Sequence, residues 1–418
     1  MNFFVVLLFF IIWRLFDFLI LYLAPKFIPY LGFFPYKEIL PLYHLPEWLT
    51  KLANFDGVHY LLISQQGYMQ YEQAYFPLYP LLVKLLTPIF FNNAFLAGFL
   101  ISNISFFFGI WFFLKLIENF KLKIENWLIV FILAFPTSFF FGAIYTEGLF
   151  FFLFIAALYF LKKKNYLLSG IFAFLASFTK LMGVFLIIPI AIKIFQEFSV
   201  FSFQFSFKSK FSIIKFLKFI SSRLNRDQIS NLFFPLLGFL IYCFYLWQTT
   251  GDPFFFLNSQ PIFGAHRSTN LVLLPQVYWR YFKILFTANH DFRYYVSLFE
   301  LMTFTFVFTV LVWDLIRIVG GTRGRAPDSA QRSEHWREGN SGQDPQLIGL
   351  SIFSLTNLLL PTLTGTFSSV PRYALLSISF FIFLATIKNN LVKITLAIIF
   401  LIFHILILGF FGQGYFIG

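Results

Sequence analysis

The sequence predicts an all-helical protein that crosses a membrane many times. Of its 418 residues, 59% are hydrophobic and only 12% are charged, whereas soluble proteins average roughly 45–50% and 25%. Phe alone supplies 69 residues, more rings than a soluble fold could bury without leaving large apolar patches on its surface. The apolar runs are too long and continuous for the strands of a membrane barrel. Disordered chains, disulfide-stapled secreted domains and ordinary cytosolic enzymes are therefore excluded.

Eleven apolar runs approach the length of about 20 residues that a spanning helix needs. The first run contains Arg14 and Asp17, lacks a positively charged leading segment and is followed by no small-residue cleavage site. We therefore expect a retained helix rather than a signal peptide, and a single membrane domain over residues 1–418. The predicted spans are 3–24, 94–115, 127–143, 146–161, 166–179, 181–196, 231–249, 296–316, 347–363, 373–387 and 394–411.

The distribution of positive charge predicts which loops face the cytoplasm. If the N-terminus lies inside, 20 of the 31 Lys and Arg residues fall in cytoplasmic segments, while the acidic residues divide almost evenly. An asymmetry confined to Lys and Arg is the positive-inside pattern of membrane proteins. The orientation of the protein in the membrane therefore explains its net charge of +13. The sequence has no basic stripe interleaved with aromatic residues of the kind that would indicate a nucleic-acid-binding surface.

Three long segments separate the predicted spans. Residues 25–93 form a first extracytoplasmic loop whose short amphipathic stretches suit the bilayer surface, and residues 250–295 form a second. Residues 320–346 contain no Phe and are rich in Arg, Gly and Ser, which predicts a disordered cytoplasmic insertion. The single Cys243 lies in an apolar run, so a disulfide framework and a Cys-based metal site are excluded.

Function is expected where charged groups lie against the bilayer, because a charge at the centre of a spanning helix costs about 2.5–3.5 kcal/mol on insertion scales. Five such residues fall near the predicted outer face: Asp56, Glu147, Lys180, Asp252 and Arg372. Each alone could be an interfacial cap or a snorkelling side chain, but their shared side favours a common site. Lys and Arg suit a phosphate, and Asp56 is a candidate general base.

Around these residues the sequence resembles the PIG-V-like mannosyltransferases, within the GT-C class of polyprenol-dependent glycosyltransferases. Phe55 departs from the family pattern, where Trp is usual, and so does Lys180, where Arg is usual; Lys gives up two-pronged phosphate binding. The 320–346 insertion is also foreign to it. The matching blocks occur in the family's order and are FDGVHYLLISQQGY (55–68), AYFPLYPLL (74–82), FPTSFFFGAIYTEGLFFFL (135–153), ASFTKLMGV (176–184), TGDPFFFLNSQ (250–260) and SVPRYALLSISFFIFLA (369–385).

The resemblance implies a GT-C-type architecture and a transferase that takes mannose, or a similar hexose, from a polyprenyl- or dolichyl-phosphate donor bound within the bilayer. Asp56 would deprotonate a hydroxyl of a glycolipid or glycan acceptor, whose oxygen attacks the anomeric carbon and inverts it. Lys180 and Arg372 would neutralise the departing lipid phosphate. The site would lie on the extracytoplasmic face of a plasma membrane, which we expect to be bacterial, or of the endoplasmic reticulum in a eukaryote.

Four further residues complete the candidate site. Under the same resemblance, Glu147 and Tyr145 would orient the sugar and Asp252 the acceptor. His59 follows Asp56 by three residues and would share its site if this stretch is helical, through a positioning hydrogen bond rather than a metal. No two His residues have the i, i+4 spacing of a helical metal site. We therefore expect no metal and no cofactor.

Other functions stay open for the same residues. A transporter or flippase of a lipid-linked sugar would also need intramembrane charge and a phosphate-binding site. Transporters, however, tend to be built from paired halves with broken helices near the midplane, and no half-repeat is visible here. A structural scaffold would leave the outer-face charges unexplained.

Several polar residues have simpler explanations. Arg14 and Asp17 lie one helical turn apart and are expected to form an intramembrane ion pair, although Arg14 could instead reach a lipid phosphate. His404 lies in an apolar helix and is expected to be a satisfied core residue. His266 and Arg267 in the second outer loop could contact a sugar or a headgroup, although a solvated part of the loop is the favoured expectation.

Overall fold

The computed structural model describes residues 2–197, 225–263, 267–323 and 344–417. Within these ranges the chain forms helices joined by turns and contains no strand. Most of the predicted 320–346 insertion lies outside the described residues, as does His266.

Six helices of the described chain are long and apolar enough to cross a membrane. All six coincide with predicted spans, so an all-helical, membrane-embedded protein is confirmed. Large apolar side chains, Leu15 and Phe244 among them, are exposed on the outside of the bundle, a surface suited to lipid rather than water. The six are α1 (Phe3–Leu23), α5 (Ala94–Asn119), α11 (Arg226–Thr250), α14 (Phe292–Arg323), α15 (Pro345–Leu359) and α18 (Asn390–Gly412).

The five other predicted spans correspond to shorter helices, so the number eleven and the GT-C-type arrangement stay predictions. One reason is local: α6 ends before Phe135, which precedes Pro136, and the residue before a proline is disfavoured in the helical region. The shorter helices are α6 (Glu125–Ala134), α7 (Glu147–Lys162), α8 (Tyr166–Thr179), α9 (Ile187–Glu197) and α17 (Ile378–Thr386).

The end of α8 shows how such a break is built. Lys180 follows the helix with an extended backbone (φ −161°, ψ 142°). The chain then turns through η7 (Leu181–Leu186), where Gly183 lies against Ser177. A Cβ on Gly183 would lie 2.2 Å from the Ser177 nitrogen, so this turn requires glycine. The break places Lys180 at a helix end instead of inside a spanning helix.

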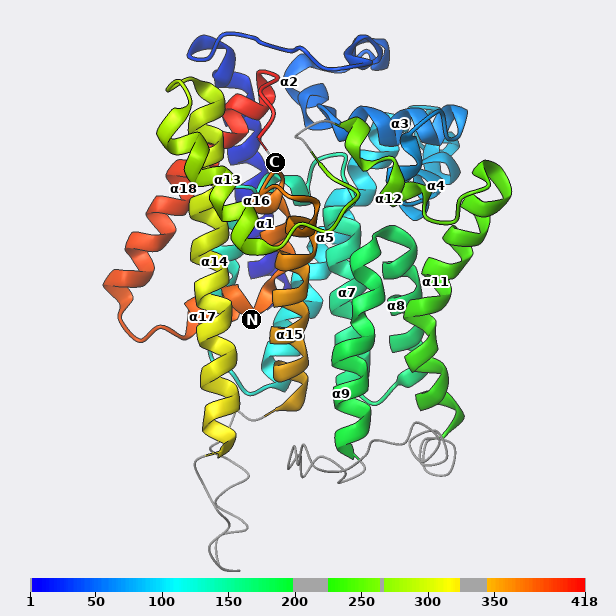
Figure 1. Cartoon of the computed structure of the whole chain (residues 1–418), viewed down its shortest axis with the longest axis vertical. Coiled ribbons are helices and arrows are strands. Elements are labelled where there is room, and N and C mark those ends of the chain that lie inside the picture. Colours follow the sequence, from blue (N-terminus) through cyan, green and yellow to red (C-terminus); the bar gives the residue numbers. More distant parts are fainter. Residues whose placement is uncertain (1, 198–224, 264–266, 324–343, 418) are drawn as a thin grey trace, which may run out of the picture.

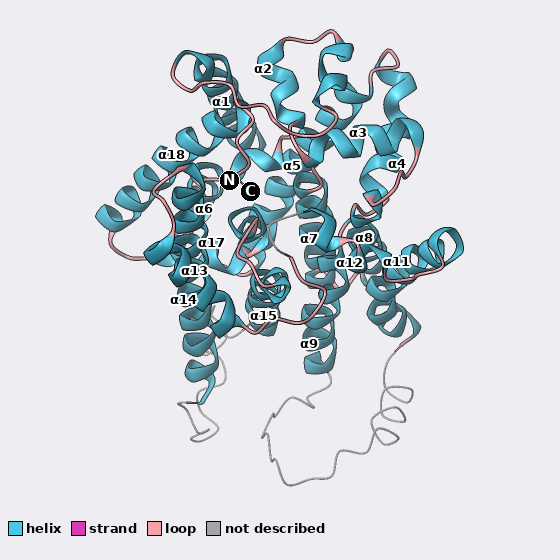
Figure 2. Cartoon of the chain, turned by 45° about the horizontal axis from the view of Figure 1, so that its top comes forward, coloured by secondary structure: helices cyan, strands magenta, loops and turns pink. Residues whose placement is uncertain are grey.

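The helices run roughly side by side between two ends of the molecule (Figure 1). Helices α9 and α14 finish, and α11 and α15 begin, at the lower end in that view. Short helices from both predicted outer loops gather at the upper end, which the turned view brings forward (Figure 2). Both loops therefore lie at the same end, as the predicted topology requires. The short helices of these two loops are α2 (Glu47–Thr50), α3 (Asp56–Gln66), α4 (Leu78–Leu86), α12 (Phe255–Asn258) and α13 (Leu274–Thr287). A further short helix, α16 (Val370–Tyr373), lies between α15 and α17.

Short 3-10 turns connect these elements and rings fill the space between them. Phe106 of α5 stacks on Phe141, with ring centroids 4.2 Å apart and planes 11° from parallel. Phe139 and Phe140 beside it are also buried. The turns are η1 (Ala24–Lys26), η2 (Lys37–Tyr43), η3 (Lys51–Ala53), η4 (Glu72–Ala74), η5 (Thr87–Phe90), η6 (Ser138–Phe141), η8 (Gln260–Phe263), η10 (Leu360–Thr364) and η11 (Ala374–Leu376).

A buried polar network joins the first and last spanning helices. Arg14 Nη1 donates to Asp17 Oδ2 at 2.7 Å, and His404 Nε2 lies 2.8 Å from the other oxygen of the same carboxylate. Arg14 also donates to the Gly142 carbonyl at 3.3 Å. The predicted ion pair and the satisfied core histidine are both confirmed. Their contact was not predicted, because Asp17 and His404 lie 387 positions apart.

Replacing Asp17 with Ala should destabilise the protein strongly. The variant leaves Arg14, which is only 5% exposed, without its carboxylate, and breaking a buried pair in this way costs about 3–5 kcal/mol. We expect a clear fall in the thermal unfolding midpoint of the detergent-solubilised protein. Asp291→Asn, which keeps a capping side chain at the surface, should leave the midpoint unchanged. A stable Asp17→Ala protein would contradict the structural role.

Candidate active site

Four of the five charged residues identified in the sequence form a row of ion pairs. Arg372 Nη1 donates to Asp56 Oδ2 at 2.6 Å, and Arg372 Nε lies 3.6 Å from Glu147 Oε1. The same Glu147 oxygen accepts a hydrogen bond from Lys180 Nζ at 2.6 Å. The ion-pair row therefore reads Asp56, Arg372, Glu147, Lys180, with charges that alternate in sign and sum to zero.

Each member of the ion-pair row lies at or near a helix end. Asp56 and Glu147 are the first residues of α3 and α7, where the positive end of the helix dipole favours a carboxylate. Lys180 follows the last residue of α8, and Arg372 lies in the single turn of α16. The helix ends therefore bring these charges together at the upper end of the bundle (Figure 1), and the ends beside Glu147 and Lys180 agree with the predicted spans 146–161 and 166–179.

The backbone immediately before Asp56 is strained. Phe55 has a φ of 60° and a ψ of −117°, which is rare for a residue other than glycine. Its ring packs against Phe34, Phe411 and Phe416, at centroid distances of 4.7, 5.7 and 5.3 Å. Such strain persists only where packing holds it, and it is found disproportionately at functional sites. Here it sets the direction in which α3 starts and in which Asp56 points.

Arg372 lies in a cage of aromatic rings. Its guanidinium carbon is 5.5 Å from the centre of the Phe140 ring, 5.4 Å from that of Tyr145 and 5.6 Å from that of Tyr373, distances typical of cation–π contacts. Exposure differs along the row: the Arg372 and Glu147 side chains are 8% and 2% exposed, but Asp56 is 25% exposed. A ligand can therefore reach the row at the Asp56 carboxylate.

Tyr75 and His59 hold the other side of Asp56. The Tyr75 hydroxyl donates to Asp56 Oδ1 at 3.2 Å. The His59 ring stacks on the Tyr75 ring, with centroids 5.3 Å apart, and its Nδ1 lies 2.9 Å from Glu72 Oε1. The stretch is helical, as the prediction for His59 required, and His59 supports the ring that contacts Asp56. Tyr75 was not singled out, although it lies in the AYFPLYPLL block.

The charges around Asp56 determine its protonation. Burial alone would raise the pKa of Asp56, but the charge and hydrogen bond of Arg372, with smaller contributions from His59 and Arg267, hold the pKa below its ordinary value of 3.8. Burial would lower the pKa of Arg372, and Asp56 and Glu147 instead raise it well above its ordinary value. Both groups are charged at neutral pH. While it is paired with Arg372, Asp56 is a weak base.

The lowered pKa of Asp56 predicts a stability difference that depends on pH. A carboxylate whose folded pKa is depressed stabilises the protein above its unfolded pKa, and that stability is lost as the pH falls through the folded pKa. The free energy of unfolding of the wild type should therefore exceed that of Asp56→Asn at neutral pH, and the gap should close in acid below pH 3.8. Denaturant unfolding of both proteins across this range measures the gap. A gap independent of pH would contradict the assignment.

Two other predicted residues contact their surroundings differently. The Tyr145 hydroxyl donates to the Asn54 carbonyl at 2.7 Å, so Tyr145 contributes its ring to the cage. Asp252 accepts hydrogen bonds from the Phe254 N–H at 2.9 Å and from Asn258 Nδ2 at 2.7 Å, which close the turn after α11. Within the described ranges, no ion pair or hydrogen bond joins Asp252 to the ion-pair row. Its role toward an acceptor stays a prediction.

Arg267 lies closer to the site than the sequence suggested. It was expected in a solvated loop, yet it is half-buried, and Nη1 donates to Gln260 Oε1 at 2.9 Å. Its charge also helps to hold down the pKa of Asp56. The next residue, Ser268, is tied through its N–H to the Thr364 carbonyl at 2.9 Å, a few residues before α16. Nothing local in the sequence indicated this contact.

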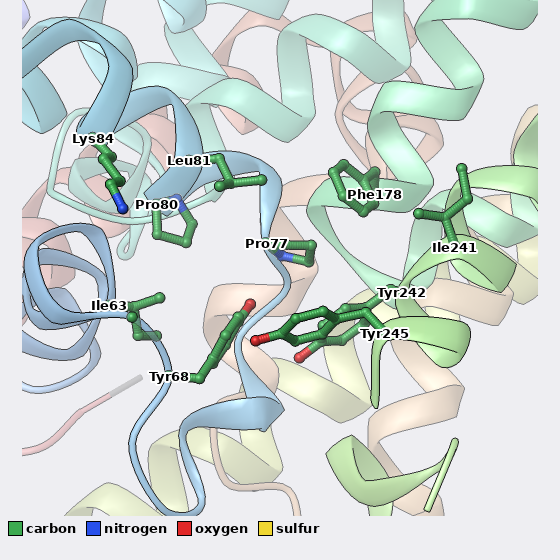
Figure 3. A pocket seen from close by; sticks show the side chains of 11 residues that line it. Ile63, Tyr68, Pro77, Pro80, Leu81, Lys84, Phe178, Ile241, Tyr242 and Tyr245 are labelled. Atoms are coloured by element: carbon green, nitrogen blue, oxygen red, sulfur yellow. The ribbon is translucent and has the colours of Figure 1, made fainter. Parts of the chain in front are cut away.

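An apolar pocket of about 340 Å³ (Figure 3) is linked to the ion-pair row through Tyr75, although no member of the row lines it. Lys84 reaches it from one side, and three tyrosine hydroxyls gather at the other. Tyr68 and Tyr242 both donate to the Tyr75 carbonyl, at 2.7 and 3.2 Å, while the Tyr75 hydroxyl contacts Asp56. Tyr75 therefore lies between the pocket and the row. The pocket is lined by Ile63, Gly67, Tyr68, Pro77, Pro80, Leu81, Lys84, Phe178, Ile241, Tyr242 and Tyr245.

Among the described residues, His, Cys, Asp and Glu side chains form no group of three suited to a metal ion. A site without metal stays a prediction. The arrangement contains an acid that can accept a proton, two cations that can bind an anion, and an apolar space beside them.

Searches of protein-family models, of curated proteins and of solved structures each found no match to this chain. The similarity to PIG-V-like mannosyltransferases therefore stays an expectation based on the sequence blocks, and any functional argument depends on the geometry of the site.

Proposed function

We propose that the protein is a membrane glycosyltransferase. It would transfer mannose, or a similar hexose, from a polyprenyl- or dolichyl-phosphate donor to a hydroxyl of a glycolipid or glycan acceptor. The observation that carries this proposal is an ion-pair row that Tyr75 links to an apolar pocket, at one end of a membrane-embedded bundle. A lipid-phosphate sugar has matching parts, namely a hydrocarbon chain, an anionic phosphate and a sugar bonded to it.

The pocket suits the hydrocarbon chain of such a donor. Its walls are apolar and aromatic, and Ile241 belongs to the spanning helix α11, whose outer surface faces lipid. Phe178, another wall residue, lies two positions before Lys180. A chain that enters between Ile241 and Phe178 would bring its phosphate toward the ion-pair row, where Lys180 and Arg372 supply positive charge.

Donor binding would convert Asp56 into a better base. The donor phosphate competes with the Asp56 carboxylate for Arg372, because both are anions that accept hydrogen bonds from the same guanidinium. When Arg372 turns to the phosphate, burial of Asp56 is no longer offset and its pKa rises. A general base works best when its pKa approaches the working pH. The ion pair in the free protein thus keeps Asp56 inactive until a donor is present.

The transfer step balances with these residues alone. Asp56 accepts the proton of the acceptor hydroxyl as its oxygen forms a bond to the anomeric carbon, from the side opposite the phosphate. The bond between that carbon and the phosphate oxygen breaks, and the lipid phosphate leaves with the bonding electrons and one more negative charge. Arg372 and Lys180 stabilise this growing charge, and the configuration at the anomeric carbon inverts.

The bias of Lys and Arg toward the predicted cytoplasmic segments of the sequence supports an extracytoplasmic site. The upper end, with the ion-pair row, would then face the outside of a bacterial plasma membrane, or the lumen of the endoplasmic reticulum in a eukaryote.

The direct test is sugar transfer by the purified protein in liposomes. The liposomes carry radiolabelled polyprenyl- or dolichyl-phosphate hexoses, with mannose first, and extracted glycolipids or glycans serve as acceptors. We expect labelled product from the wild type and from Asp291→Asn, and none from Asp56→Asn. Failure of the wild type with every donor would overturn the proposal. Movement of the intact donor between leaflets, without a new glycosidic bond, would instead favour the flippase.

A further inference from the structure

The loop that precedes Arg372 is held by buried polar side chains from several helices. Ser369 has a φ of 65°, a left-handed conformation that is uncommon outside glycine. Thr137 Oγ1 donates to the Pro371 carbonyl at 2.7 Å, and Asn357 Nδ2 donates to the Tyr373 carbonyl at 2.7 Å. The backbone on both sides of Arg372 is therefore fixed by neighbouring elements.

Glu300 and Tyr281 hold the beginning of this loop. The Tyr281 hydroxyl of α13 donates to Glu300 Oε2 of α14 at 2.6 Å. The same hydroxyl oxygen accepts the Phe367 N–H at 3.0 Å and lies 3.1 Å from Thr366 Oγ1. The backbone N–H of Ser369 also lies close enough to the Glu300 carboxylate to stabilise its charge. The left-handed turn at Ser369 thus depends on one acid of a spanning helix.

Burial of this acid needs an explanation, because Glu300 is only 5% exposed and a carboxylate within a membrane-spanning helix is costly. The other buried acid of α14, Asp314, forms an ion pair with Arg317 three residues away, at 3.2 Å. Glu300 forms no ion pair within 4 Å among the described residues; Arg267 acts on it only from further away. The Glu300 carboxylate accepts a hydrogen bond from Tyr281 and lies near the Ser369 backbone N–H, so it supports the loop.

We propose that Glu300 is a positioning residue that sets the place of Arg372 through Tyr281 and Ser369. The Arg372 N–H donates to the Ser369 carbonyl at 3.1 Å, so the conformation of Ser369 determines where α16 starts. From α16, the Arg372 guanidinium extends to Asp56. Loss of the Glu300 contacts lets Ser369 leave its left-handed conformation and moves Arg372 away from the ion-pair row.

The structural part of this inference can be tested without any substrate. Hydrogen–deuterium exchange, measured by mass spectrometry on the detergent-solubilised protein, reports on the amides of residues 366–373. We expect at least about tenfold faster exchange in Glu300→Leu.

Tyr281→Phe loses a single hydroxyl and should show a similar increase. It replaces Glu300→Leu in the test if that variant folds poorly. Glu300→Gln keeps one acceptor oxygen and should restore much of the protection. Asp314→Asn should leave this segment unchanged, and unchanged exchange in both Glu300→Leu and Tyr281→Phe would overturn the inference.

The functional part rests on the proposed function and uses a double-mutant cycle. If Glu300 acts by placing the two-pronged guanidinium of Arg372, Tyr281→Phe and Glu300→Leu weaken donor binding by the wild type but have little further effect in the Arg372→Lys background, where that geometry is already lost. Asp314→Asn should have the same small effect in both backgrounds. Additive losses would contradict action through Arg372. A wild type that transfers no sugar would end the proposed function, while the exchange experiment would still decide the role of Glu300.

Discussion

Asp56→Asn should abolish sugar transfer and yet bind polyprenyl phosphate more tightly than the wild type. The amide cannot accept the acceptor's proton, and loss of a general base typically lowers the rate by about 10²–10⁴-fold. In the free protein, Asp56 holds Arg372 Nη1 at 2.6 Å and competes with the phosphate. Its removal should raise affinity by about tenfold, which corresponds to roughly 1.4 kcal/mol. A residue that only contributes to folding would not produce opposite effects on binding and transfer.

Two measurements on the same protein sample separate these effects. Binding of polyprenyl phosphate is followed by its protection against thermal unfolding, because a ligand that binds only the folded state stabilises it by RT ln(1 + L/Kd), where L is the free ligand concentration, so that tighter binding gives a higher midpoint at the same ligand concentration. Transfer is followed with labelled donor in liposomes. Asp291→Asn is the matched control, since it makes the same change at an exposed helix cap of the same end of the molecule. Transfer by Asp56→Asn at the wild-type rate would rule out Asp56 as the general base. Weaker binding of polyprenyl phosphate by this variant would rule out competition between Asp56 and the phosphate for Arg372.

The six long spans could be predicted because the signal is local. A run such as α18 is apolar over more than the thickness of a bilayer, and no distant contact is needed to recognise it. The shorter elements depend on tertiary structure. The end of α8 at Thr179 agrees with the predicted span 166–179, and the packing of Gly183 on Ser177 gives its structural reason. The single turn of α16 is set by side chains from elsewhere in the fold and does not appear in the apolar pattern.

The candidate site was predictable as a set of residues, not as a set of contacts. Unusual charges beside apolar runs identified Asp56, Glu147, Lys180 and Arg372. Their pairing could not be predicted, because Asp56 and Arg372 lie 316 positions apart and either cation could have matched either acid. Glu300 was missed since one acid in an apolar helix has no local sign of what it contacts.

Arg372→Ala should have the second large effect, because it removes the cation that two acids share. Asp56 and Glu147 would then be left with Lys180 alone, and loss of one partner from a buried pair costs up to about 3–5 kcal/mol of stability. We expect a lower unfolding midpoint, loss of measurable protection by polyprenyl phosphate, and loss of transfer. Arg372→Lys keeps the charge without the two-pronged geometry, so stability should recover further than transfer. Arg317→Ala, which removes an exposed guanidinium near the C-terminal end of α14, should leave phosphate binding intact.

The double variant Asp56→Asn/Arg372→Ala separates stability from catalysis. It removes both charges of one ion pair, so it leaves one fewer uncompensated carboxylate than Arg372→Ala. The unfolding midpoint should rise above that of Arg372→Ala, while transfer and phosphate binding stay lost because both functional groups are gone. If the recovered stability brought back transfer, Arg372 would act only as a structural partner of Asp56. If the midpoint did not recover, the pair would not be the interaction that Arg372→Ala breaks.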